Sequence, residues 1–196
     1  MNTKAITATI VLAAVTVALN PALSGIGIPA PYAPFLIYQI WEIPIVTAFL
    51  LLGAKYGLAI SALNSMVLLA IFPGALLMGP FYNLIAIVSM LLGIYMVHRL
   101  LDNRTTRDQT SDYVLKHKTK LVSLSTALGI MLRVGAMTAV NYAVLRYSAP
   151  LGYSLPEEAI LGSLPLIAVF NATLALYTIP LGHIIADAVS SNLRFR

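Results

Sequence analysis

The stretch from residue 5 to residue 41 contains no charged side chain, and it sets the first limit on the fold. A transmembrane helix needs about 20 mostly apolar residues, so this stretch is long enough for a span. The rest of the chain is similar, since 59% of all residues are hydrophobic and only 10% are charged. Soluble domains carry about 25% charged residues, so a soluble enzyme and a disordered chain are both excluded. The sequence predicts an all-α integral membrane protein.

Turn-forming and charged residues divide the chain into six predicted transmembrane helices. Prolines and glycines between residues 20 and 34 separate the first two, and the glycine-flanked turn at 53–57 separates the next two. Residues 102–120 hold eight of the nineteen formal charges, which predicts an aqueous loop. The helices are expected at about 5–20, 34–53, 56–72, 80–99, 121–147 and 159–189. Residues 1–196 then form a single membrane domain.

Lysine and arginine predict the orientation. With the N-terminus inside the cell, ten of the twelve basic residues fall on the cytoplasmic side, while Arg146 lies at an outer end and Arg133 within a helix. Such an excess of basic residues is typical of cytoplasmic loops. Both termini and the loop 102–120 are therefore predicted to be cytoplasmic, in a multi-pass plasma-membrane protein. A cleaved signal peptide at the N-terminus is the alternative, but its loss would leave five spans and break the charge asymmetry.

Polar residues interrupt the predicted helices, although a charge at the centre of a span costs about 2.5–3.5 kcal/mol. The helical rise of about 1.5 Å per residue places five of them at similar depth in the outer half of the bilayer. These five are Glu42, Asn64, Asn83, Asn141 and Asn171. A cavity open to the outside would lie at this depth, whereas the alternative is that the amides only bond helix to helix. Arg133 lies deeper, and we expect it to pair with Glu42 or with backbone carbonyls in a structural role.

Two further patterns bear on binding. Tyr38, Trp41 and Tyr82 lie deeper than an interfacial aromatic belt and have ring faces that can stack on a planar ligand. Ala14 and Ala18 form a small-residue face on the first helix, where another helix can approach closely. The helix that approaches this face can belong to the same chain or to a separate subunit.

Several chemistries lack the residues they require. The chain has no cysteine, and its three histidines have no spacing that gathers metal ligands on one helical face. It also has no phosphate-binding Gly-x-x-x-x-Gly-Lys-Ser/Thr loop, so if transport is driven uphill by ATP, another subunit must supply the power. We therefore predict a protein that is not an enzyme and has no metal, no cofactor and no nucleic-acid partner.

Two segments resemble the substrate-binding S components of energy-coupling factor (ECF) vitamin transporters. Residues 34–44 read Pro-Phe-Leu-Ile-Tyr-Gln-Ile-Trp-Glu-Ile-Pro, and residues 52–57 read Leu-Gly-Ala-Lys-Tyr-Gly. Both are similar to the riboflavin-binding members, as are Arg133 and residues 137–138, 141–142 and 170–171. Two positions depart from the pattern: Glu42 stands where Asp is more usual, and Asn64 where a basic residue would be unsurprising.

The resemblance implies a subunit that captures a vitamin, riboflavin as the first candidate, at the outer face for ATP-driven uptake. The partners it implies are a membrane coupling subunit, reached through Ala14 and Ala18, and two ATPase subunits. The candidate ligand-binding residues are Tyr38, Trp41, Glu42, Asn64, Tyr82, Asn83, Asn141 and Asn171. Two other functions stay open from the residues alone: an autonomous secondary transporter or channel, and a non-binding assembly subunit of a larger membrane complex.

Overall fold

The computed structural model describes residues 3–71, 77–102 and 111–193. Helices dominate these residues, with one short β-hairpin near the N-terminal end of the chain. The elements are α1 (Thr3–Ala18), α2 (Pro21–Ser24), β1 (Ile28–Ala30), β2 (Ala33–Tyr38), α3 (Glu42–Leu52), α4 (Ala54–Ile71), α5 (Gly79–Asp102), α6 (Ser111–Val144) and α7 (Glu157–Leu193).

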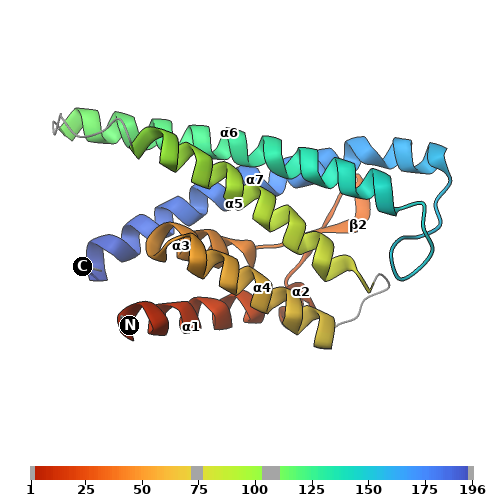
Figure 1. The fold of residues 1–196 in the computed structure, drawn as a ribbon, viewed down its shortest axis with the longest axis horizontal. Helices are drawn as coiled ribbons and strands as arrows, with labels where there is room; N and C mark the ends of the chain where they lie inside the picture. Colours follow the sequence, from red (N-terminus) through yellow and green to blue (C-terminus); the bar gives the residue numbers. More distant parts are fainter. Residues whose placement is uncertain (1–2, 72–76, 103–110, 194–196) are drawn as a thin grey trace.

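The helices form an elongated bundle in which α6 packs along both α5 and α7 (Figure 1). On the other side, α3 contacts α1, α4 and α7, and it therefore joins the two parts of the bundle. The two ends of the chain lie at the same end of the bundle in Figure 1, and the α6–α7 connection lies at the opposite end. This arrangement fits the prediction that both termini lie on one side of the membrane.

Glycine is needed for a close helix contact at Gly93 and for a turn at Gly53. A Cβ on Gly93 of α5 would lie 2.7 Å from the backbone nitrogen of Gly129 on α6, so a larger residue at this position would force the two helices apart. Between α3 and α4 the chain turns at Gly53, whose φ of 108° is a conformation that L side chains rarely adopt. The predicted break between these helices is therefore present, but it is confined to Gly53, because α4 begins at Ala54 and residues 54–57 form its first turn.

Among the described residues, four helices are long and apolar enough to cross a membrane, namely the segments Ala54–Ile71, Gly79–Leu101, Lys118–Val144 and Glu157–Ser191. Helices α1 and α3 are apolar but shorter. Large apolar side chains are exposed on the long helices, for example Leu100 of α5 at 68% and Met131 of α6 at 67%. Such exposure is costly in water and is expected on a lipid-facing surface. The total of six spans stays a prediction.

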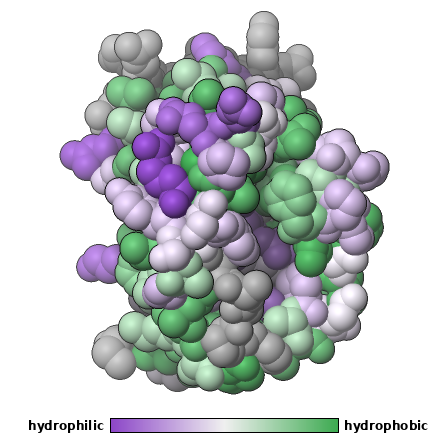
Figure 2. All heavy atoms as spheres, turned by 90° about the vertical axis from the view of Figure 1, so that its right-hand side faces the viewer, coloured by the Kyte–Doolittle hydropathy of each residue, from purple (hydrophilic) through white to green (hydrophobic). Residues whose placement is uncertain are grey.

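Figure 2 shows the end of the bundle opposite the termini, where hydrophilic and hydrophobic residues are both at the surface. Exposed charged side chains near this end include Arg146, Glu157 and Glu158, which flank the connection between α6 and α7. An end that carries charge, beside flanks that are apolar, is the distribution expected where a bundle leaves the bilayer.

The second predicted helix, 34–53, is wrong over its first part. Residues 33–38 form β2, which pairs antiparallel with β1 so that Ile28 faces Tyr38, and α3 begins only at Glu42. Prolines at 29, 31 and 34 oppose a helix in this region, and the hairpin satisfies backbone groups through its own ladder. Apolar composition alone therefore made the second helix too long.

The predicted aqueous loop 102–120 is also shorter than expected. Helix α6 begins at Ser111, so residues 111–120 are helical, while residues 103–110 lie outside the described part of the chain. Charged residues report that a segment meets water, but they do not prevent a helix from extending beyond the bilayer. The predicted 121–147 helix is accordingly the later part of α6, which ends at Val144.

Candidate ligand-binding cavity

A buried ion pair joins three helices at the centre of the bundle. Arg133 on α6 is only 2% exposed, and Glu42, the first residue of α3, is 1% exposed. Both terminal nitrogens of the guanidinium donate to the Glu42 carboxylate, the Nη2–Oε1 distance being 2.8 Å. Nε donates to Oδ1 of Asn171 on α7 at 3.0 Å. The predicted pairing of Arg133 with Glu42 is confirmed, and the two charges compensate each other.

The local sequence explains why Glu42 stands at this place. An acidic side chain in the first turn of a helix is favoured by the helix dipole, and Pro44 is tolerated there because the first turn needs no donor. The hydroxyl of Tyr177 on α7 donates to the carbonyl of Gln39, which fixes the segment that leads into α3. Helix α3 therefore starts deep enough in the bundle to reach Arg133.

A cavity with a volume of ≈ 630 Å³ adjoins this pair, and Arg133 is one of its lining residues. It lies between β2, α5, α6, α7 and the α6–α7 connection. The lining residues are Phe35, Leu36, Gly79, Tyr82, Asn83, Arg133, Met137, Asn141, Leu145, Tyr153, Leu155, Ser163, Ile167, Phe170 and Asn171. Its walls are mainly apolar and aromatic with a few polar groups, which is the usual composition of a small-molecule site.

The polar groups of the cavity differ in what they can still bind. Asn171 is engaged at both ends, since its Nδ2 also donates to the carbonyl of Ile167 at 2.9 Å. Asn141 donates from Nδ2 to the carbonyl of Met137 at 2.7 Å, which leaves its Oδ1 as an acceptor. The Asn83 side chain has no hydrogen-bond partner among the described residues. Asn83 and Asn141 are therefore the amides best able to bind a ligand.

Four of the eight residues predicted to bind a ligand line this cavity: Tyr82, Asn83, Asn141 and Asn171. Glu42 does not line it but contacts Arg133, which does. The Tyr38 ring packs in a tilted contact against the ring of Phe170, a lining residue, with the ring centroids 5.1 Å apart. The cavity therefore brings together residues from the predicted second, fourth, fifth and sixth helices.

Trp41 and Asn64 lie elsewhere in the interior. Both are buried, and neither Nε1 of Trp41 nor either amide atom of Asn64 has a hydrogen-bond partner among the described residues. They are not lining residues of the cavity. Trp41 instead belongs to the apolar core with Ile45, Ile60 and Met90. Asn64 was predicted at the same depth as the other amides, but its side chain does not line the cavity that Asn83, Asn141 and Asn171 line.

The β-hairpin and the α6–α7 connection supply residues that the sequence did not single out. Phe35 and Leu36 come from β2, and Tyr153 and Leu155 come from the connection. Tyr82 ties the connection to α5, because its hydroxyl donates to the carbonyl of Leu151 at 2.8 Å. No local pattern marks such residues, since they reach the cavity only through the tertiary fold.

The hairpin also carries a pair of tyrosines whose hydroxyls are 2.6 Å apart, Tyr32 and Tyr38. Loss of solvation and the hydrogen bond to Tyr38 raise the pKa of Tyr32 to about 12. The Tyr32 phenol is therefore neutral at physiological pH. The pair joins the hairpin tip to the strand that covers the cavity.

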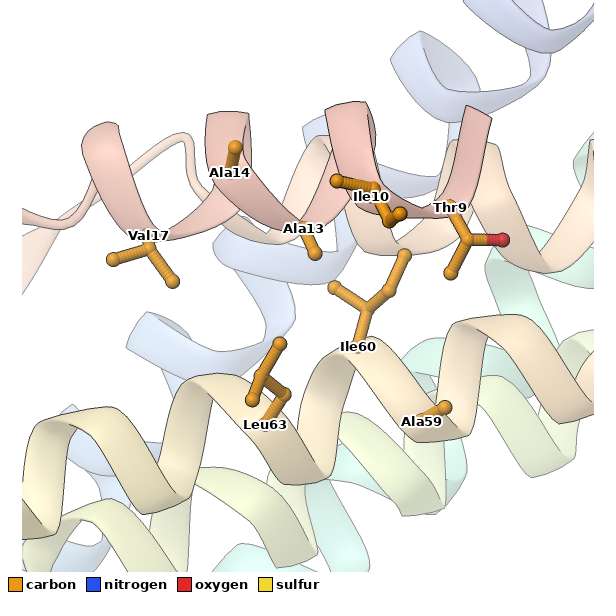
Figure 3. A pocket seen from close by; sticks show the side chains of 8 residues that line it. All are labelled: Thr9, Ile10, Ala13, Ala14, Val17, Ala59, Ile60 and Leu63. Carbon is orange, nitrogen blue, oxygen red and sulfur yellow. The ribbon is translucent and has the colours of Figure 1, made fainter. Parts of the chain in front are cut away.

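Ala14 and Ala18 lie on the exposed side of α1, whereas Ala13 and Thr16 are buried against the bundle. A groove of ≈ 520 Å³ runs between α1 and α4 and includes Ala14 at its rim. Figure 3 shows Ala13 and Val17 of α1 pointing toward Ile60 and Leu63 of α4. The small-residue face is therefore open, and in the described part of the chain no helix occupies it.

The histidines are less isolated than their sequence spacing indicates. The rings of His98 on α5 and His183 on α7 stack with their centroids 5.5 Å apart, near the ion pair of Lys118 with Asp187 at 2.7 Å. Within the described residues, no group of three or more metal-ligating side chains is present. The stack lies at the end of the bundle where the chain terminates, away from the cavity.

Comparisons with protein-family models and with curated proteins gave no match. Among solved structures, the S component of a bacterial ECF transporter is similar over 100% of both chains, with a TM-score of 0.60 and 17% sequence identity. Full coverage at this score shows the same arrangement of helices, while the low identity restricts the comparison to the fold. The chain thus shares the fold of an ECF transporter S component.

Proposed function

We propose that the protein is the substrate-binding subunit of an ECF-type transporter and that it captures a neutral small molecule in the cavity beside Arg133. The shared fold supports this role, and so does the position of the cavity at the end of the bundle away from the termini. Riboflavin is the first candidate ligand. The protein has no catalytic part in this proposal, because capture and release require only binding groups.

The observation that carries the proposal is a roomy cavity whose charge is already compensated. Glu42 neutralises Arg133 through two hydrogen bonds, and the third donor direction is taken by Asn171. An anionic ligand would have to compete with Glu42 for the guanidinium, and a carboxylate already in place is hard to displace. The site therefore favours a ligand without net charge.

The remaining contacts favour a ligand that is flat and polar along one edge. Asn83 and the Oδ1 of Asn141 offer donors and acceptors on neighbouring helices, while Phe35 and Phe170 offer ring faces. Aromatic groups stack with centroids about 4.5–7 Å apart, and buried polar edges need hydrogen-bond partners. A heterocyclic vitamin such as riboflavin combines these two requirements.

Powering uptake is assigned to partner subunits in this proposal. The chain has no nucleotide-binding loop of its own, and the open face of α1 with Ala14 and Ala18 allows a second helix to approach closely. We place a membrane coupling subunit on this face, acting with two ATPase subunits. The coupling subunit would contact the side of α1 that points away from the bundle core.

Ligand binding is tested by isothermal titration of the detergent-solubilised protein with riboflavin. Asn83→Ala and Asn141→Ala should weaken binding roughly five- to a hundredfold, because each lost hydrogen bond leaves a ligand group unsatisfied at about 1–3 kcal/mol. Asn103→Ala, in the predicted cytoplasmic loop, is the matched control and should bind as the wild type does. If both cavity variants keep wild-type affinity, these amides do not hold the ligand and the proposed site is wrong.

Partner docking is tested separately by Ala14→Trp and Ala18→Trp. Bulk at this face should abolish uptake in cells that hold the coupling and ATPase subunits, while riboflavin binding by the isolated protein stays intact. Ile184→Trp is the control, since Ile184 on α7 is 62% exposed and large already. Loss of binding together with uptake in the alanine variants would show that the face belongs to the interior packing.

A further inference from the structure

The segment that holds the β-hairpin, residues 20–40, exposes apolar side chains and carries no charge. It lies within the stretch 5–41, which contains no acidic or basic residue. Six large aliphatic and phenyl side chains of this hairpin segment are at least 39% exposed: Leu23, Ile26, Ile28, Phe35, Ile37 and Ile40. Ile28 of β1 and Phe35 of β2 are the most exposed of the six, at 70% and 68%. Apolar exposure on this scale is costly in water and marks a surface that contacts something else.

Polar side chains of the hairpin segment form hydrogen bonds inside it. The Asn20 side chain accepts from the backbone nitrogen of Ala22 at 3.1 Å, and the Ser24 hydroxyl donates to the carbonyl of Asn20 at 3.0 Å. The hydroxyls of Tyr32 and Tyr38 bond to each other at 2.6 Å. Local bonds of this kind satisfy polar groups without solvent. The segment therefore combines exposed apolar side chains with polar side chains that have partners.

The backbone of the hairpin limits how deep it can lie in a bilayer. In the described part of the chain the sheet has only the strands β1 and β2, so the outer edge of β1 is open. This edge is short, with three residues, and Pro29 at its centre has no N–H to satisfy. An open sheet edge does not occur in the hydrocarbon core, where no water can bond to it. The hairpin therefore fits the boundary between headgroups and acyl chains, where tyrosine is also favoured.

The two segments that cover the ligand cavity differ in charge. Leu36 of β2 and Tyr153 of the α6–α7 connection both line it. Exposed charges at Arg146 and Glu157 flank the connection, whereas the hairpin segment has none. In Figure 1, β2 lies in the half of the bundle toward the connection, which is the predicted outer half. Since charged groups stay in water while apolar groups enter lipid, the two covers are expected to meet different surroundings.

We infer that the hairpin segment lies in the outer headgroup–acyl boundary of the bilayer and that its exposed apolar side chains contact lipid. Lipid fits this surface better than a protein partner, because a protein interface surrounds its apolar centre with a polar rim and this segment has no charged residue. One wall of the cavity then contacts the bilayer, and the α6–α7 connection is the wall that water reaches. The inference goes beyond the proposed function and does not depend on which ligand binds.

Tryptophan fluorescence in proteoliposomes tests this placement with the full chain and no added ligand. The protein has one tryptophan, Trp41, which is 0% exposed, so the wild type measures its background emission. Ile28→Trp and Ile26→Trp each add a tryptophan to the exposed apolar surface. Phospholipid brominated near the headgroup should quench the added emission strongly, because bromine quenches only indoles that it touches. Iodide supplied on both sides of the membrane should quench it weakly.

Two further variants calibrate the quenchers. Met131→Trp lies near the middle of the predicted 121–147 helix at a side chain that is 67% exposed, and lipid brominated near the end of its acyl chains should quench it most. Tyr147→Trp replaces a side chain that is 55% exposed beside Arg146, and iodide should quench it most. Circular dichroism establishes that each variant is folded before the comparison.

Three results would overturn the inference. Iodide quenching of both hairpin variants to the extent seen in Tyr147→Trp would place the hairpin in water. Strongest quenching by bromine near the chain ends, as in Met131→Trp, would place it in the hydrocarbon core. Added emission that neither reagent lowers would mean that protein, such as a second copy of the chain, covers the surface. None of these measurements uses a ligand, so the lipid contact can fail while the proposed vitamin site stands.

Discussion

Removing one partner of the buried pair Glu42–Arg133 should be strongly destabilising. In Glu42→Ala, the guanidinium loses both bonds to the carboxylate and keeps only Asn171 and the Met90 sulfur at 3.5 Å as partners. Arg133 is 2% exposed, and the walls of the cavity that it lines are mainly apolar, so its charge would be left poorly compensated. Breaking a buried ion pair in this way costs about 3–5 kcal/mol. This is a large part of the about 5–15 kcal/mol that stabilises a typical domain.

Replacing both partners should cost much less than removing one. In Glu42→Leu with Arg133→Met, no charge stays buried, and substituting apolar residues for a buried pair is often neutral or stabilising by about 1–4 kcal/mol. Against this, Oδ1 of Asn171 loses its donor, which costs about 1–3 kcal/mol. We therefore expect the unfolding free energy of the double variant to lie within about 2 kcal/mol of the wild-type value.

Equilibrium unfolding in a fixed detergent, read by circular dichroism, gives the stabilities of the wild type, Glu42→Leu, Arg133→Met and the double variant, which form the double-mutant cycle, and that of Glu42→Ala beside them. The losses in unfolding free energy of the two single variants should sum to much more than the loss in the double variant, because the two residues are in direct contact. Glu42→Ala with wild-type stability would refute the reasoning, since it would mean that Arg133 finds water or another acceptor at no cost. A double variant less stable than either single variant would show that the pair itself, and not its isolated charge, decides stability.

Three further predictions concern packing, the interior and topology. Gly93→Ala should lower the unfolding free energy by about 1–3 kcal/mol, since its Cβ would lie 2.7 Å from the α6 backbone. Gly135→Ala is the control and should cause no such loss, because its Cβ would have nothing within 4 Å. Thermal melting in detergent compares the two variants. Asn64→Leu should melt no lower than the wild type and bind riboflavin normally, because the buried Asn64 amide has no partner among the described residues; weaker binding would place Asn64 in the ligand site. Cysteines at Ser154 and Ser191 should react with a membrane-impermeant reagent from opposite sides of the membrane, and reaction of both from outside intact cells would contradict the topology.

The long helices of the fold were predictable from apolar length and from turn residues. Gly53, Gly79 and Pro156 stand at or just before the first residues of α4, α5 and α7, which is why these helices begin close to the predicted positions. The hairpin was not predictable in the same way, because a short apolar run such as Phe35 to Tyr38 has no period that separates a strand from a helix. The depth predicted for Glu42 therefore assumes a helical rise over residues 34–38, which form a strand.

Part of the site was visible in the sequence because polar residues are conspicuous in an apolar helix. Asn83, Asn141 and Asn171 were found by this signal, and so was the partner of Arg133. Depth along a helix does not determine which way a side chain faces, and Asn64 therefore was grouped with residues it does not join. Tyr153 and Leu155 carry no signal, since only the tertiary fold brings the α6–α7 connection over the cavity.

The central claim is that a neutral small molecule occupies the cavity beside Arg133. The most direct measurement is mass spectrometry and absorbance of the molecule that purifies with the protein, or of riboflavin added to it, for the wild type and for Met137→Trp. Met137 lines the cavity and is 8% exposed, whereas Met131→Trp on the same helix, 67% exposed, is the control. We predict one neutral, conjugated molecule bound per chain in the wild type and in Met131→Trp, and none in a folded Met137→Trp. A wild type that binds no such molecule, or full retention of the molecule by Met137→Trp, would contradict the account.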